Sequence, residues 1–262
     1  MANAPVYYAL AQARFNPVTA MSKYVEQIQD RLRQVGYPLF EPQQITQLVV
    51  PAPDQVPQAE PQITHTVSWL ITRSDRTAGF ILAPSAITYH TTHYDTHEEF
   101  IPELLRGLAT VHEAVTLDHV SRLGLRYLDA VVPRAGESVE QYLVGGLHGL
   151  DFDAHPLYRL AESVFRTEIG PLVSEGTLVA RVYRMTAPLR FPPDVQPSGL
   201  MINPKFDAKE TQAHAVIDTD HFAEGHMPID QDKLGEQLIS LHATIKSVFR
   251  AMTTDYALGA WA

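Results

Sequence analysis

The segment that most constrains the fold is an amphipathic stretch near the end of the chain. Its apolar side chains recur at steps of three and four residues, and they are Leu234, Leu238, Leu241, Ile245, Val248, Phe249 and Met252. This spacing places them on one face of an α-helix, and Asp232 precedes them as a candidate N-cap. A helix of this length needs a broad apolar surface to cover. The sequence therefore predicts that this helix packs on a β-sheet.

The same reasoning gives the order of the other elements. Apolar spacing predicts helices over residues 21–35 and 97–115, and a short glycine-interrupted helix within 139–150. Strands are predicted at 6–15, 43–50, 63–72, 79–82, 86–94, 119–132, 164–169, 178–185 and 214–220. The proline-rich segments 51–61 and 188–206 are expected to be surface connections. Runs of strands separated by helices predict an α+β fold, with helices packed on one face of a largely antiparallel sheet.

The length of 262 residues fits one large domain or two small ones. If the chain is divided, the irregular stretch after residue 133 is the expected boundary. It would separate an N-terminal α+β half (1–133) from a C-terminal α+β half (134–262), and the two halves could also form one continuous domain.

Charge and composition exclude several classes of protein. Lys and Arg number 20 against 30 Asp and Glu, so the net charge is −10, which disfavours nonspecific nucleic-acid binding. The absence of cysteine excludes disulfides, thiolate nucleophiles and zinc–thiolate sites, and it fits a reducing compartment. The chain has no signal-peptide pattern and no run of eighteen apolar residues. We therefore expect a cytoplasmic protein with no membrane association.

Several segments resemble a known family. They are the Arg-Leu-Gly-Leu-Arg-Tyr stretch at 122–127, Ala-Arg-Phe-Asn-Pro at 13–17, Ile-Asp-Thr-Asp at 217–220, and the last helix with His242, Ile245 and Phe249, followed by Trp261. Together they resemble a sporadically distributed family of bacterial conserved hypothetical proteins of similar length. Asp129 stands where that pattern leads us to expect Asn. The resemblance implies no catalytic residue or cofactor. A patchy distribution is typical of mobile loci, such as toxin–antitoxin or phage-defence cassettes, so it implies a partner-dependent role.

The candidate site is a set of polar side chains on one face of the predicted sheet. Arginines are spaced to share a strand face with other polar residues, and Gly124 leaves open space between two of them. A guanidinium group pairs in a two-pronged manner with carboxylate or phosphate. The arginines would therefore either pair with the carboxylates of Asp218 and Asp220 or bind an anion or partner. The candidate binding residues are Arg122, Arg126, Arg166, Arg181 and Tyr183.

Metal and catalytic signatures are weak in this sequence. Asp218 and Asp220 share a strand face and could hold a divalent cation, but the spacing of the nearby His214, His221 and His226 matches no standard metal motif. His90, His93 and His97 do not converge, because residues three apart on a strand face opposite ways. No nucleophile–base set can be named, so no catalytic residue, metal or cofactor is predicted.

These observations predict a non-enzymatic, cytoplasmic binding or regulatory protein. It would act through a protein partner encoded by a neighbouring gene, within a mobile defence or toxin–antitoxin-like locus. One alternative is a metal-dependent hydrolase or nuclease that uses Asp218 and Asp220. Another is an anion- or nucleic-acid-binding module that uses the strand arginines. Exposed edge strands also make a homodimer a reasonable expectation.

Overall fold

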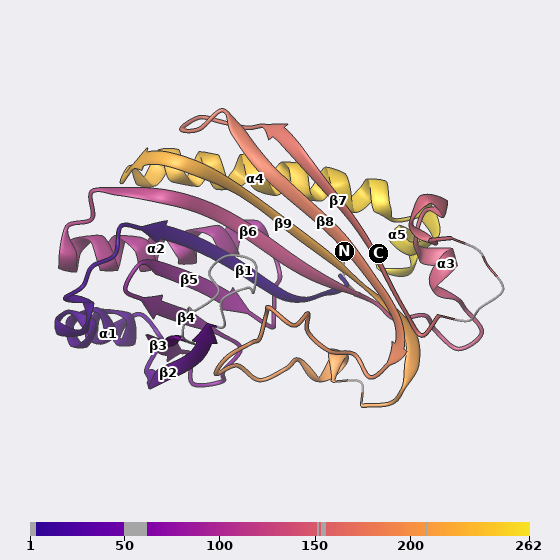
Figure 1. Cartoon of the computed structure of the whole chain (residues 1–262), viewed down its shortest axis with the longest axis horizontal. Coiled ribbons are helices and arrows are strands. Elements are labelled where there is room, and N and C mark those ends of the chain that lie inside the picture. The colour runs from indigo at the N-terminus through magenta and orange to yellow at the C-terminus, as the bar shows by residue number, and fades with distance from the viewer. Residues whose placement is uncertain (1–3, 50–61, 151, 153–155, 208) are drawn as a thin grey trace.

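The computed structural model describes residues 4–49, 62–150, 152, 156–207 and 209–262. Its strands form a single antiparallel sheet in the order β2-β3-β4-β5-β1-β6-β9-β8-β7 (Figure 1). The strands are β1 Val6–Phe15, β2 Leu39–Val49, β3 Gln62–Thr72, β4 Ala78–Ala83, β5 Ala86–Thr91, β6 His119–Val131, β7 Tyr158–Glu168, β8 Glu175–Ala187 and β9 Gln212–Pro228. The predicted α+β fold with an antiparallel sheet is confirmed. Because β6 pairs with β9, the sheet is continuous between residues 1–133 and 134–262.

Five helices accompany this sheet in the described part of the chain. They are α1 Val25–Gln34, α2 His97–Val115, α3 Val139–Tyr142, α4 Gln231–Met252 and α5 Asp255–Ala260. α1, α2 and α4 lie along one face of the sheet, and α3 and α5 lie at the far end of α4 (Figure 1). The main core lies between the long helices and the sheet, and the packing of α3 and α5 around Trp261 extends it. None of the described helices is both long and apolar enough to span a membrane.

The α4 helix buries the predicted apolar face. Leu234, Leu238, Leu241, Ile245 and Met252 are all buried. The N-cap prediction was wrong by two residues: the Asp230 side chain, not that of Asp232, accepts a hydrogen bond from the Lys233 amide at 3.1 Å. Asp230 has the extended backbone that a cap requires, whereas Asp232 already lies within the first turn.

Some strands begin or end at other residues than the local sequence pattern predicts, because pairing with a neighbouring strand extends them. β9 continues to Pro228 because it pairs with β6 and β8 along most of its course. β2 begins at Leu39 and includes Pro42, which is tolerated because β2 is an edge strand that pairs, among the described strands, with β3 alone. The predicted proline-rich connection at 51–61 lies outside the described residues.

Side chains of β6 alternate between the two faces of the sheet. Leu123, Leu125 and Tyr127 point into the helix-covered core. Arg122 and Arg126 point to the opposite face, called here the reverse face. Part of that face is covered by the 188–206 segment, whose apolar side chains pack on the sheet. The cluster comprises Val195 and Phe206 of the segment with Tyr7, Tyr8, Leu128, Ala130 and Val216 of the strands.

Candidate functional site

The centre of the reverse face is a buried ion-pair network around Arg126. Its Nε and Nη2 atoms donate hydrogen bonds to the two carboxylate oxygens of Asp218, at 2.8 and 2.7 Å. Its Nη1 and Nη2 atoms donate to Asp194 of the 188–206 segment, at 2.7 and 3.1 Å. Burial works to lower the pKa of Arg126, but the bonds to the two carboxylates outweigh burial and raise the pKa. The guanidinium is therefore charged, and four of its five N–H donors are bound to these two carboxylates.

Two further arginines of the predicted site face carboxylates as well. Arg181 Nε donates to Glu162 Oε2 at 2.5 Å, and Arg181 Nη1 lies 3.7 Å from Asp218 Oδ2. Arg122 Nη2 lies 3.6 Å from Asp220 Oδ2, and its guanidinium stacks 4.0 Å above the ring centre of Phe222. These contacts neutralise the arginines within the sheet itself.

Arg166 and Tyr183 lie on the same face, nearer the edge of the sheet. Arg166 is exposed and donates a hydrogen bond to Thr177 Oγ1 at 3.1 Å; within the described ranges it forms no ion pair. Tyr183 is half-buried beside the network, and burial followed by the charge of Asp218 raises its pKa. The structure thus gathers Arg122, Arg126 and Arg181 around carboxylates and leaves Arg166 facing solvent.

The edge strand β7 exposes apolar side chains beside this network. It pairs with β8 on one side, and no strand of the described residues pairs with it on the other. Leu160, Val164 and Phe165 are exposed, and Val164 has 60% of its surface accessible. Cross-strand register aligns Val164 with Val179, then Asp220, then Arg126, which places Val164 on the reverse face. We call the free edge of β7, together with Leu160, Val164 and Arg166, the β7 surface.

A pocket of about 390 Å³ lies on the helix side, where β1 and β6 meet α2 and α4. Tyr94, Tyr127 and Asp129 line its interior, and the exposed residues Lys246 and Arg250 also border it. It is a second candidate site because it combines apolar walls with a few polar groups.

Asp129 is the unusual residue of this pocket. It is buried, and in the described part of the chain its carboxyl group makes no hydrogen bond or ion pair. Burial, followed by the charge of Asp218, raises the pKa of Asp129 to about 8. At neutral pH it is therefore an uncharged acid, which can donate and accept hydrogen bonds as an amide does. The Tyr127 hydroxyl is also buried, with no well-formed hydrogen bond to a described residue.

The residues considered for metal binding are dispersed. Asp218 is fully buried and engaged by Arg126 through both oxygens. His90 is buried against the Tyr8 hydroxyl, 2.9 Å from its Nδ1, whereas His93 is exposed.

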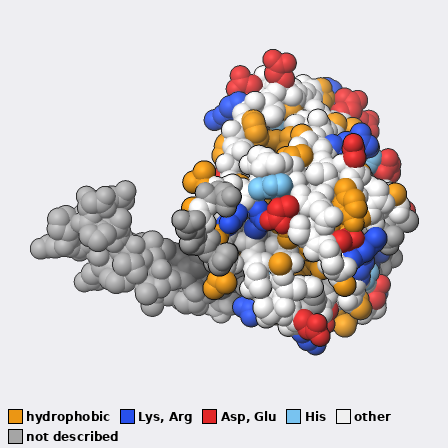
Figure 2. Space-filling view, turned by 90° about the vertical axis from the view of Figure 1, so that its right-hand side faces the viewer, with side chains coloured by type: hydrophobic (Ala, Val, Ile, Leu, Met, Phe, Trp, Pro, Cys, Tyr) orange, Lys and Arg blue, Asp and Glu red, His pale blue; other side chains and the backbone are white. Residues whose placement is uncertain are grey.

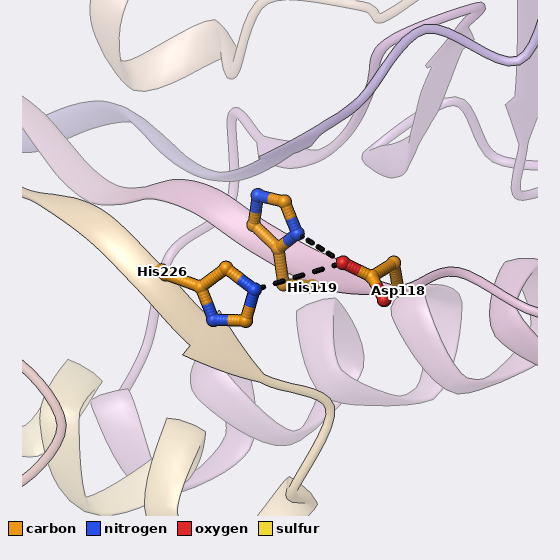
Figure 3. A group of neighbouring side chains, drawn as sticks. All are labelled: Asp118, His119 and His226. Carbon is orange, nitrogen blue, oxygen red and sulfur yellow. Dashed lines mark hydrogen bonds and ion pairs between the residues drawn. The ribbon is translucent and has the colours of Figure 1, made fainter.

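A group that the sequence pattern did not reveal does converge: Asp118, His119 and His226 (Figure 3). In the sequence, only the adjacent Asp118-His119 pair pointed to this group. The third member, His226, comes close to the pair because β6 lies beside β9 in the sheet.

Charges on the visible surface are mixed rather than segregated. Figure 2 shows the end of the molecule near α3 and α5, where basic and acidic side chains are interspersed with apolar ones. This view contains no broad basic patch of the kind that binds nucleic-acid backbones.

No protein-family model matches the chain, and no curated protein matches it. The resemblance drawn from residues 122–127 therefore stays a prediction, and the site has to be interpreted from its own geometry.

Proposed function

We propose that the chain is a non-enzymatic binding protein that docks a partner protein on the β7 surface. The observation that carries this proposal is the combination of a free strand edge with exposed apolar side chains along β7. A long edge strand offers a row of backbone donors and acceptors, and soluble proteins commonly shield or charge such edges. An extended segment of another protein can add to this edge as a further strand.

The chemistry of β7 specifies the kind of segment that would fit. Leu160 and Val164 offer apolar contact on the reverse face. Arg166 is the neighbouring charge without a carboxylate partner in the described chain, whereas Glu162 is already paired with Arg181. The proposed occupant is therefore an extended segment of a different protein that alternates apolar residues with an acidic one. Following the resemblance above, we propose that a neighbouring gene in a mobile, defence-type locus encodes it.

The two alternatives from the sequence find less support. An anion-binding module needs spare cationic groups, but Arg122, Arg126 and Arg181 all face carboxylates. A metal-dependent hydrolase using Asp218 and Asp220 needs accessible carboxylates, and Asp218 is fully buried beneath Arg126. The ion pairs of the three arginines and the burial of Asp218 both favour a structural role for the network.

The test uses the full-length chain and two matched variants. Stoichiometric partners are captured from the native host, purified, and titrated against the chain by calorimetry. Val164→Asp places a charge on the docking surface and should weaken binding at least about tenfold. Ile239→Asp, at an exposed aliphatic position on α4, should leave affinity unchanged. No stoichiometric partner, or equal affinity in both variants, would contradict the proposal.

Light scattering should find the free chain monomeric, because a dimer dissociated by Val164→Asp would mean that a second copy occupies the edge.

The pocket supports a second candidate function, the binding of a small, largely apolar ligand that carries a polar group. The observation that favours it is a pair of buried polar side chains in its wall: Asp129, whose carboxyl group makes no hydrogen bond within the described residues, and Tyr127, whose hydroxyl has only the neighbouring Tyr94 as a candidate partner there. Native mass spectrometry of the chain purified from its host should then show a bound molecule that Asp129→Leu releases. A wild-type chain that carries no additional mass would exclude this candidate.

A further inference from the structure

Three side chains from distant parts of the chain converge on one point of the surface. Asp118 follows α2, His119 begins β6, and His226 lies near the end of β9. Asp118 Oδ2 lies 2.7 Å from His119 Nδ1 and 3.6 Å from His226 Nε2, so two imidazoles share one carboxylate oxygen (Figure 3). The two imidazole rings stack with their centres 4.0 Å apart.

We propose that Asp118, His119 and His226 bind a divalent transition-metal ion such as Zn²⁺. Two imidazole nitrogens and one carboxylate oxygen are typical ligands of zinc, cobalt, nickel and copper ions. Magnesium and calcium ions prefer sites made of oxygen atoms alone. Two neutral imidazoles and one carboxylate also carry a single negative charge, which partly compensates a divalent cation.

The distances between the donor atoms suit a tetrahedral ion after a small adjustment. All three donor atoms lie within 4.8 Å of one another. A zinc ion with bonds of about 2.1 Å holds its ligand atoms about 3.4 Å apart. The separation of 3.6 Å between Asp118 and His226 already matches this value. The shorter separation of 2.7 Å between Asp118 and His119 widens when the metal replaces the proton that they share.

Strand pairing holds His119 and His226 near each other, and the exposed side chains can rotate to complete the coordination of an ion. β6 and β9 are hydrogen-bonded neighbours, and His119 is in register with Pro228, two residues beyond His226. The Asp118 and His226 side chains are 78% and 70% exposed, so both can rotate toward an ion. Three protein ligands leave a fourth position for water or for a group from outside the chain.

A second pair of stacked histidines, His97 and His242, serves as a comparison. It shows that the metal site requires three donor atoms close together and not merely two stacked rings. Their rings also stack with centres 4.0 Å apart. However, the nearest carboxylate contact is between His97 and Glu98, and no three donor atoms gather there in the described residues. Stacked histidines alone therefore do not predict a metal site in this protein.

The test is metal titration of the chelator-treated, full-length chain. Calorimetry with Zn²⁺ should show one ion per chain, and Co²⁺ should give the visible absorption of a tetrahedral site. His226→Ala and Asp118→Asn, both at exposed positions, should each weaken Zn²⁺ binding at least about tenfold. His93→Ala removes an exposed histidine outside the group and should leave binding unchanged.

Two results would overturn the metal proposal. One is the absence of saturable Zn²⁺ and Co²⁺ binding by the wild-type chain. The other is binding that His226→Ala does not weaken, or that His93→Ala weakens equally. Thermal unfolding without metal should be the same for His226→Ala and the wild-type chain, which separates loss of a ligand from loss of the fold.

Discussion

Replacing Asp129 with Asn should stabilise the protein at neutral pH. In the unfolded chain the carboxyl group ionises near its ordinary pKa of 3.8, whereas burial raises its pKa in the fold to about 8. The folded state therefore holds a proton that the unfolded state releases. Between these two pKa values, the free energy of unfolding falls by about 1.4 kcal/mol for each pH unit gained.

The magnitude at neutral pH follows from this slope. At pH 7 the loss amounts to about 4 kcal/mol relative to acid conditions below the unfolded pKa. Asparagine has nearly the same shape and cannot ionise, so Asp129→Asn avoids this loss. The variant should be more stable than the wild-type chain by roughly 4 kcal/mol at pH 7, and by little near pH 4.

Urea unfolding of both proteins from pH 4 to pH 8.5 measures this difference directly. The gap between the two curves should widen with pH and level off as pH rises through the folded pKa of about 8. Asp207→Asn makes the same chemical change at an exposed position and serves as the control. A gap that is constant with pH, or a variant that is less stable throughout, would refute the reasoning about Asp129.

Other substitutions test the packing of the fold, with urea unfolding as the common measurement. Leu238→Ala should lower the free energy of unfolding by about 2–5 kcal/mol because the side chain is fully buried, while its exposed neighbour Ile239→Ala should change it by less than about 0.5 kcal/mol. Arg126→Ala should cost about 3–5 kcal/mol, since it removes both short hydrogen bonds to the buried Asp218 carboxylate and leaves it only the longer contact with Arg181, and the exposed Arg166→Ala should cost almost nothing. Gly107→Ala should destabilise by about 1–3 kcal/mol despite better helix propensity, because the new Cβ would lie 2.5 Å from a ring carbon of the facing sheet. The described packing would be contradicted if Ile239→Ala or Arg166→Ala lowered the free energy of unfolding substantially. It would also be contradicted if a change at one of the buried positions left that free energy unaltered.

Local spacing was enough to predict the layers of this fold. The face of α4 follows from the steps between Leu234, Leu238 and Leu241, and the two faces of β6 follow from alternation around Arg122 and Arg126. In both cases neighbours in sequence decide which side of an element a residue occupies. The charged reverse face could therefore be expected before the strands were placed side by side.

Contacts between distant segments could not be predicted in this way. Asp194, which binds Arg126, lies in a proline-rich segment without periodicity, so nothing in its neighbourhood indicates a buried partner. The proximity of His119 and His226 depends on the register of β6 against β9, which the local pattern does not specify. The raised pKa of Asp129 likewise depends on the elements that bury it, and before the structure only the family resemblance had marked this position, by implying Asn there.

The position of β9 has a consequence for synthesis of the chain on the ribosome. β6 is complete by Val131, but its outer neighbour β9 begins only at Gln212 and is inserted between β6 and β8. Until those residues emerge, the backbone donors and acceptors along one edge of β6 lack the strand that pairs with them in the finished fold. Fragments released by premature termination within this interval would expose that strand edge and should be prone to aggregate.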